Sequence, residues 1–381
     1  MDMMMTESQL TLRDAVRKFA EAELLPRYMH WDRSGEWLPK SFTDKLVEMG
    51  LLRLRMPEKL GGQGFSFVDC GIVCEEIGRC DPQIRYLISS AVHISEMSSE
   101  MHPDLQEEWL PRIANGEIMA LAFTEPGGGT DAANIRTKAS RDGDFFVING
   151  EKTSVSFTGV ASVIFVSART GGPGPWGLSF FMVPADTPGI RTSNYERMGQ
   201  RLTRGGSIFF DDVRVPARNM IGKENKGFVW AMTIIGYNRN FVALACIGAA
   251  QKSIDETAAY MKTREVLGQA VSKWQGAAHA LAAEQTKLQA ARLLCYNALA
   301  LVDRGLRHDP ESSMAKWYGV KVANEAIETC MRLHGHYGWS KDFPFEQRLR
   351  DCLGMESADG PREVHLGIIS RDIFGKEFAP F

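Results

Sequence analysis

The order of the hydrophobic patterns along the chain is the feature that most limits its fold. Apolar residues recur at three- and four-residue spacing, typical of helices, over about residues 8–118 and again from about 226 onward. Between them, over about residues 119–221, short β-branched and aromatic runs are separated by Gly, Pro and Asp, which is typical of strands and turns. Because the strands are grouped and do not alternate with helices, a doubly wound nucleotide-binding fold is excluded. We expect a mainly helical α+β multidomain chain with a middle antiparallel β-barrel or sandwich.

Three domains follow from these patterns: an N-terminal helical domain at 1–119, a middle β domain at 120–225 and a C-terminal helical domain at 226–381. The clearest strand patterns are at 145–149, 163–166, 178–183 and 207–210. Long helices are predicted at about 228–262, 272–304 and 310–334, with breaks at Gly335 and Gly338.

Charge and cysteine content narrow the function classes. Lys and Arg number 44 against 47 Asp and Glu, a formal net charge of −3, whereas a nucleic-acid partner would call for a basic excess. The first residues, MDMMMTESQL, lack the basic and apolar regions of a secretion signal. The seven cysteines are therefore expected to be reduced thiols in a cytoplasmic protein. Cys70 and Cys74 lie one helical turn apart without a matching zinc-type pair, so we expect no metal.

The longest apolar run, residues 228–251, is as long as a membrane span but carries Arg239 between two Asn residues. Because a charge at the centre of a bilayer is costly, we interpret the run as a buried helix and expect no membrane association. A buried Arg needs an anionic partner or a polar ligand group. From the residues alone, Arg239 could serve an internal salt bridge or a ligand.

The densest local signal is LAFTEPGGGTD, residues 121–131. Three consecutive Gly residues expose backbone N–H groups, and Thr124 and Thr130 add hydroxyl groups beside them. The segment matches neither the phosphate-loop motif nor the dinucleotide motif, so an ordinary turn and a ligand loop both remain open.

A second signal begins at Asn149-Gly150, which predicts a hairpin turn. In the strand that would follow, alternation places Ser154 and Ser156 on one face. Two small hydroxyl groups on one face fit either a strand edge or the wall of a ligand site. Near the C-terminus, Asp359 precedes Gly360 and Pro361, a pattern typical of a turn or a helix cap.

Taken in order, these segments resemble the acyl-CoA dehydrogenase family over nearly the whole chain. The family's Thr-Glu-Pro-Gly-x-Gly-Ser/Thr-Asp motif stands at 124–131 and its Asn-Gly-x-Lys motif at 149–152. The remaining matches are Met198 to Arg201, Phe210 to Pro216, Gly248 to Gln251, Tyr260, Arg264 and the pair Arg350 and Asp351. The resemblance implies a C-terminal four-helix bundle, with FAD held between the β domain and that bundle and the acyl thioester lying against the flavin.

The resemblance also assigns site residues. Those matching FAD-contacting positions are Phe123, Thr124, Thr130, Ser154, Ser156, Arg264, Arg332, Gly335, Gly338 and Pro361. Those matching positions near the acyl-CoA are Thr130, Arg239 and Gly360. In the family, the equivalents of Arg264 and of the turn at 335–338 reach the FAD of a partner subunit, which implies a homotetramer or a homodimer.

Several residues depart from the family pattern. Ser154 replaces a Trp that shields the flavin, and Pro361 replaces a Thr, which removes an N–H and a hydroxyl near the flavin. Arg332 stands where Gln is usual, and His336 where Gly is usual. The Ser154 departure bears on the choice of electron acceptor, and those at Arg332 and His336 bear on the contacts with the adenosine of FAD.

The catalytic base implied by the resemblance is Asp359. Many members carry Glu-Gly-Thr eight residues after Arg-Asp, and that count from Asp351 reaches Asp359. A smaller branch reads Ala-Asp-Gly-Pro-x-Glu-Val-His, as this chain does at 358–365. The alternative base position carries Asn238, which cannot accept the proton. Because Asp is one methylene shorter than Glu, about 1.5 Å, the α-carbon must come closer, as a ring or branched acyl group would allow.

The expected reaction is removal of the α-proton by this carboxylate with transfer of a β-hydride to flavin N5, which yields a 2-enoyl-CoA. An electron-transfer flavoprotein is the expected acceptor. Two alternatives stay open: a flavin oxidase of the nitroalkane-oxidase type that uses the same Asp base, and a non-enzymatic flavin-binding relative.

Overall fold

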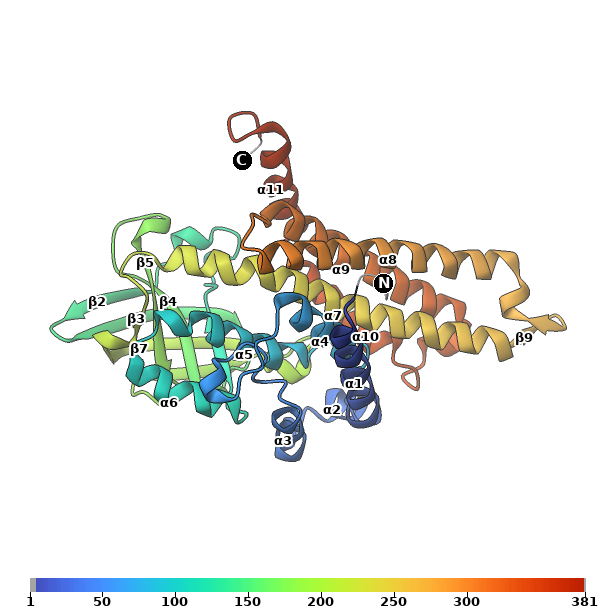
Figure 1. Ribbon diagram of the computed structural model, residues 1–381, viewed down its shortest axis with the longest axis horizontal. Helices are drawn as coiled ribbons and strands as arrows, with labels where there is room; N and C mark the ends of the chain where they lie inside the picture. The colour runs from blue at the N-terminus through green and yellow to red at the C-terminus, as the bar shows by residue number, and fades with distance from the viewer. Residues whose placement is uncertain (1–4, 380–381) are drawn as a thin grey trace.

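The computed structural model describes residues 5–379 and has the predicted order of helices, strands and helices. The β domain lies at one end of an elongated molecule and the β9–β10 hairpin at the other (Figure 1). The N-terminal helices are α1 (Glu7–Glu23), α2 (Tyr28–Ser34), α3 (Lys40–Glu48), α4 (Phe67–Gly78), α5 (Arg85–Met97) and α6 (Pro103–Ala114).

The C-terminal helices form a long bundle that confirms the helices predicted there. They are α7 (Gly227–Thr263), α8 (Gln275–Asp303), α9 (Asp309–Leu333), α10 (Phe345–Leu353) and α11 (Arg362–Phe374). Helix α7 has 37 residues, about 55 Å at 1.5 Å per residue, and runs from the β domain to the hairpin of β9 (Glu265–Val266) and β10 (Gln269–Ala270) (Figure 1). One apolar core joins this bundle to the N-terminal helices.

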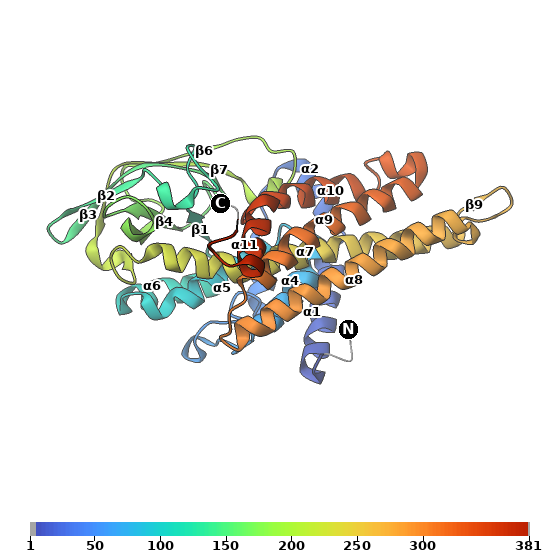
Figure 2. The same cartoon turned by 90° about the horizontal axis from the view of Figure 1, so that it is seen from above.

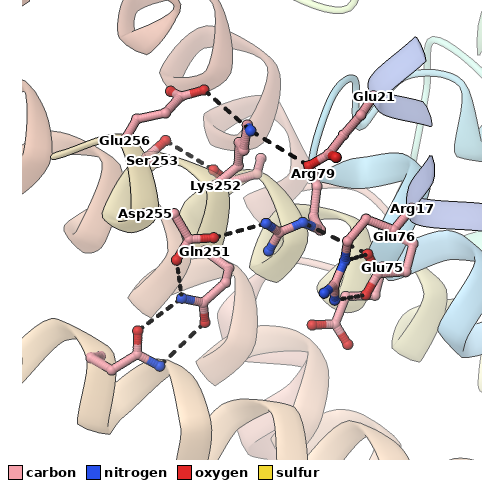
Figure 3. A network of polar contacts seen from close by, with 12 residues as sticks. Arg17, Glu21, Glu75, Glu76, Arg79, Gln251, Lys252, Ser253, Asp255 and Glu256 are labelled. Carbon is pink, nitrogen blue, oxygen red and sulfur yellow. Dashed lines mark hydrogen bonds and ion pairs between the residues drawn. The ribbon is translucent and has the colours of Figure 1, made fainter. Parts of the chain in front are cut away.

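Helix α4 packs unusually close to α7 because glycine stands on both sides of the contact. A Cβ atom at Gly248 would lie 2.1 Å from the carbonyl oxygen of Glu75, and one at Gly78 would lie 2.3 Å from that of Ala245. Ion pairs then attach α1 to this pair of helices (Figure 3). Arg17 Nη2 lies 2.7 Å from Glu76 Oε1 on α4, and Lys252 of α7 lies 3.7 Å from Glu21.

The middle domain is one hydrogen-bonded sheet of eight strands around its own apolar core, seen from above in Figure 2. The strands are β1 (Met119–Ala122), β2 (Lys138–Asp142), β3 (Phe145–Val155), β4 (Val163–Arg169), β5 (Leu178–Pro184), β6 (Ile190–Asn194), β7 (Gly206–Pro216) and β8 (Met220–Ile221). Their order is β6-β7-β3-β2-β4-β5-β8, and β1 pairs with β4. Most pairs are antiparallel, whereas β4 is parallel to β1 and β2.

The predicted hairpin at Asn149-Gly150 is wrong, because both residues lie inside β3. The turn that joins β2 to β3 is at Gly143, whose φ is 58°. The Asn149 side chain instead bonds across to Asp212 of β7 at a register shift, with Nδ2–Oδ1 at 3.0 Å and Asp212 N–Oδ1 at 2.9 Å. A side chain that bridges two strands at a bulge uses the same residue types as a hairpin turn, which explains the error.

Candidate active site

Asp359 lies on a short, strained turn between the 3-10 segment Gly354–Glu356 and α11. Its φ is 54°, in the left-handed region that few non-glycine residues occupy, and Gly360 follows with φ 108°. Strain of this kind persists only where the surroundings hold it, and it gathers at functional sites. The turn therefore needs contacts that keep Asp359 in place.

Two neighbouring residues of α7 contact Asp359. Asn238 Nδ2 donates to Oδ2 of Asp359 at 2.6 Å, and Arg239 Nε donates to its backbone carbonyl at 3.3 Å. Both α7 residues are buried, and burial lowers the pKa of Arg239. Within residues 5–379, no carboxylate lies within ion-pair distance of Arg239, so the internal salt bridge considered from the sequence is absent. The structure thus unites three residues that sequence reasoning had selected separately.

Lys316 of α9 and His365 of α11 clamp the same turn. Lys316 Nζ donates to the carbonyl oxygens of Glu356 at 2.8 Å and Gly360 at 2.7 Å, and His365 Nε2 lies 2.9 Å from that of Gly360. Burial lowers the pKa of Lys316 to about 8 and that of His365 to about 3. A neutral His365 must therefore carry its proton on Nε2 to donate this bond. Sequence reasoning missed both residues, although a lysine between apolar helix positions is a usable signal.

The glycine-rich loop is anchored by a buried ion pair. Lys152 Nζ of β3 lies 2.8 Å from Glu125 Oε1, 3.1 Å from the carbonyl of Phe123 and 3.0 Å from Ser167 Oγ. The Glu125 carboxylate also accepts the backbone N–H groups of residues 136 and 137. Burial lowers the pKa of Lys152 to about 8. The two motifs that the sequence presents separately are thus joined by one pair of side chains that was not predicted.

The predicted hydroxyl residues gather beside this anchor, at the end of β3. The backbone N–H of Thr153 donates to the carbonyl of Thr124 at 2.8 Å, which holds the loop against the strand. Within the described part of the chain, no residue bonds the hydroxyl groups of Thr124, Thr130 or Ser156, whereas Ser154 Oγ accepts from a Tyr hydroxyl at 3.3 Å.

The predicted single face for Ser154 and Ser156 is wrong. Ser154 has φ 55°, and β3 ends at Val155, so regular alternation stops before Ser156.

A third set of contacts holds α10, the helix that precedes the Asp359 turn in the chain. Asp351 of α10 accepts a bond from Gln83 Nε2 at 3.1 Å, and Gln200 Nε2 donates to its backbone carbonyl at 2.9 Å. Arg350 Nη1 donates to the carbonyl of Met198 at 2.6 Å. Burial raises the pKa of Asp351. Arg350 and Asp351 therefore join α10 to residues 198–200 of the β domain. Asp351 lies eight residues before Asp359 in the chain.

The other predicted cofactor residues lie far from Asp359. Arg264 follows the end of α7 and is exposed, and exposed Arg332 pairs with Glu328 one turn earlier on α9. Gly335 is exposed, while Gly338 is buried. From residue 238, which contacts Asp359, to residue 264, α7 extends about 39 Å at 1.5 Å per residue. One subunit therefore does not bring these residues together with Asp359.

Residues 5–379 show neither a membrane-spanning helix nor a cluster of metal ligands. No helix there combines the length and the apolar character needed to cross a membrane. His, Cys, Asp and Glu side chains of this part form no group of three or more that could hold a metal ion. All seven cysteines are free and buried.

Comparison with known proteins identifies the family. Models of the acyl-CoA dehydrogenase N-terminal, middle and C-terminal domains match residues 6–117, 120–213 and 225–374. The cyclohexane-1-carbonyl-CoA dehydrogenase of Geobacter metallireducens is 34% identical over 97% of this chain and 98% of its own. The chain belongs to the acyl-CoA dehydrogenase family. The predicted resemblance is confirmed, and so is the enzyme class, because the family consists of oxidoreductases.

Two further relatives of this acyl-CoA dehydrogenase bear on its chemistry. The CarC subunit of the caffeyl-CoA reductase-Etf complex of Acetobacterium woodii is 32% identical over 97% of this chain and 98% of its own. A solved glutaryl-CoA dehydrogenase from Mycobacterium smegmatis, in complex with FADH2, superposes with a TM-score of 0.92 at 26% identity over 100% of this chain and 97% of its own.

Proposed function

We propose that this enzyme is an FAD-dependent acyl-CoA dehydrogenase in which Asp359 removes the α-proton of an acyl-CoA to give a 2-enoyl-CoA. The observation that carries the proposal is the position of the Asp359 carboxylate on a strained turn. Residues of three helices, α7, α9 and α11, hold this turn. Asn238 donates to one carboxylate oxygen, Oδ2, and Oδ1 stays available to receive a proton. A base fixed in this way contributes about 10²–10⁴-fold to the rate of a proton transfer.

The residues of the glycine-rich loop and of the end of β3 fit a flavin. The relative in complex with FADH2 supports this cofactor, and the hydroxyl groups without partners beside a glycine-rich loop suit a ligand rich in polar atoms. When bound, the flavin would accept the hydride that leaves the β-carbon. Residues of this subunit that would contact it are Phe123, Thr124, Thr130, Ser154, Ser156 and Pro361.

The partner subunit would supply the rest of the FAD site. Its copies of Arg264, Arg332, Gly335 and Gly338 lie at the far tip of the bundle, and the length of α7 supports contact with FAD across an interface. We therefore propose a homotetramer, or at least a homodimer. The free thiols fit a cytoplasmic location, and the Etf complex of the A. woodii relative supports an electron-transfer flavoprotein as acceptor.

Substrate placement follows from the same turn. Gly360 follows the base directly, so its backbone is suited to the thioester, and Thr130 and Arg239 would contact the CoA portion. Arg239 has a second task in this proposal: its bond to the Asp359 carbonyl orients the catalytic turn. The ring substrate named for the G. metallireducens relative makes cyclic acyl-CoAs a first choice for testing.

The test is anaerobic flavin bleaching by straight, branched and cyclohexane-type acyl-CoAs. We expect Asp359→Asn to keep its FAD and to lose about 10²–10⁴-fold in the bleaching rate. Glu363→Gln, which removes an exposed carboxylate from the next helix, is the matched control and should bleach as the wild type does. Near-normal bleaching by Asp359→Asn would exclude this residue as the base. Bleaching by nitroalkanes with oxygen uptake, and by no acyl-CoA, would favour the oxidase alternative.

A further inference from the structure

Arg85, the first residue of α5, is a buried cation without an anionic partner. The residue is 1% exposed, and among residues 5–379 no carboxylate lies within ion-pair distance of it. Its Nη2 lies 3.5 Å from Met355 Sδ, a weak acceptor, and its guanidinium carbon lies 3.9 Å from the centre of the Tyr86 ring. Its Nη1 is buried and bonds to no atom of the described residues.

Two other buried arginines, Arg292 and Arg348, are neutralised by carboxylates, and buried Arg239, which has no carboxylate partner, donates to the Asp359 carbonyl. Arg292 Nε lies 2.6 Å from Glu75 Oε1, and Arg348 Nη1 lies 2.7 Å from Glu256 Oε2. Removing a charge from water costs several kcal/mol unless a partner and hydrogen bonds compensate. Stacking on Tyr86 recovers only part of this cost. Arg85 is therefore prepared for a partner that the chain itself does not provide.

The surroundings of Arg85 lie next to the catalytic turn. Tyr86 Oη lies 3.6 Å from Met355 Sδ, and Met355 is four residues before Asp359. Burial raises the pKa of Tyr86, and the charges of Arg85 and Asp359 act on it in opposite directions. Tyr86 thus lies within the influence of both charges.

A second route of contacts leads from the base toward Arg85. Asp359 bonds to Asn238, and the preceding residue, Tyr237, shares a hydrogen bond of 2.9 Å with His93 Nδ1 on α5. Burial lowers the pKa of His93 to about 3, with a further contribution from Arg85. His93 is therefore neutral and adds no positive charge of its own.

We propose that Arg85 binds an anionic group carried by the acyl portion of the substrate, such as a carboxylate at the end of the acyl chain opposite the thioester. The proposal rests on the proposed function. The acyl portion is the part of an acyl-CoA that must enter the interior beside Asp359, whereas the charged CoA phosphates remain nearer to water. A guanidinium offers two parallel N–H donors to a carboxylate, and Nη1 of Arg85 has a donor free for this purpose.

Matched pairs of substrates test the proposal. Flavin reduction is measured with ω-carboxyacyl-CoAs and with straight-chain acyl-CoAs of equal length, such as adipoyl-CoA with hexanoyl-CoA and glutaryl-CoA with pentanoyl-CoA. We expect the wild type to prefer the carboxylated member of at least one pair. In Arg85→Gln the ratio of kcat/KM values for that pair should fall about 10- to 100-fold, as expected for hydrogen bonds to a charged group. Arg85→Lys should recover part of the ratio.

Arg292→Gln is the control, because it removes a buried arginine that is already paired, and it should leave the ratio unchanged. An unchanged ratio in Arg85→Gln, or a wild type that prefers every uncharged member, overturns the proposal while the dehydrogenase function stands. Flavin reduction by no acyl-CoA at all overturns the dehydrogenase function itself, and the proposal with it.

A melting-temperature measurement tests, without any substrate, whether Arg85 lacks an anionic partner within the protein. Arg85→Met removes an unpaired buried charge, so the holoenzyme should melt at the same temperature as the wild type or at a higher one. Arg292→Gln leaves Glu75 buried without its cation and should melt at a clearly lower temperature. A loss in Arg85→Met as large as that in Arg292→Gln would mean that Arg85 is neutralised within the protein, and the proposal would fail.

Discussion

Lys316 is expected to make the stability of this enzyme depend on pH in a window where surface lysines contribute little. Burial lowers the pKa of Lys316 from 10.5 to about 8, even though its ammonium group donates to the carbonyls of Glu356 and Gly360. At 1.36 kcal/mol per pKa unit, holding the charged form in the folded protein costs about 3 kcal/mol relative to water. The hydrogen bonds offset part of the cost of burying this side chain.

The direction of the effect follows from proton binding. Between pH 8 and pH 10.5 the unfolded chain keeps a proton on Lys316 that the folded protein has released. Stability therefore rises with pH through this window as the buried charge disappears, and below about pH 8 the full cost remains. In Lys316→Met this contribution is absent, so the stability difference, wild type minus variant, should grow by up to about 3 kcal/mol across the window.

Equilibrium urea denaturation of both proteins, from about pH 7 to about pH 10.5 at one protein concentration, measures this difference. Cys and Tyr residues of the unfolded chain also titrate in this range, but they are common to both proteins and cancel in the comparison. Lys321→Met, on the same helix but in contact with solvent, is the control and should follow the wild type at every pH. Parallel curves for the wild type and Lys316→Met would refute the reasoning, because they would mean that the Lys316 ammonium is not desolvated.

Two other predictions concern the FAD site. Lys152→Met should lower the free energy of unfolding by about 3–5 kcal/mol, because the carboxylate of Glu125 stays buried without its cation. The same change should lower the flavin content. An unchanged melting temperature would contradict the role of Lys152 as the anchor of the glycine-rich loop. Arg264→Ala should weaken FAD retention without changing the melting temperature of the apoprotein, because this side chain is exposed in the single subunit. Unchanged flavin content after gel filtration would count against a contact with FAD across the interface.

The helices and the domain order could be predicted from the sequence because they depend on periodic burial, which each segment records in its own residues. The break at Gly335 and Gly338 is an example, since α9 ends at Leu333. Asn149-Gly150 failed for the opposite reason. The conformation there depends on a partner strand, because Asn149 bonds to Asp212 more than sixty residues away in the chain.

The candidate site shows the same division. Asp359 was selected by the family's interval after Asp351, which can be counted along the chain, whereas Lys316 and His365 were missed because they bond to backbone carbonyls. Backbone carbonyls have no signature in a sequence. The absence of a partner for Arg85 could not be predicted at all, since it depends on where every carboxylate of the fold ends up.

The contacts also explain what the ordered motifs do in this fold. Glu125 of the glycine-rich motif is held by Lys152 of the next motif, and Asp351 is held by residues of the β domain. These charged residues bond to each other, to other side chains or to backbone, so they position the site and are not free to react. Groups of the proposed site that lack a protein partner among the described residues include the hydroxyl of Thr130, Oδ1 of Asp359 and Nη1 of Arg85. Of the three groups only Nη1 of Arg85 is fully buried, and because a fold rarely buries a polar atom without compensation, it points more directly to a ligand than the fully bonded motif residues do.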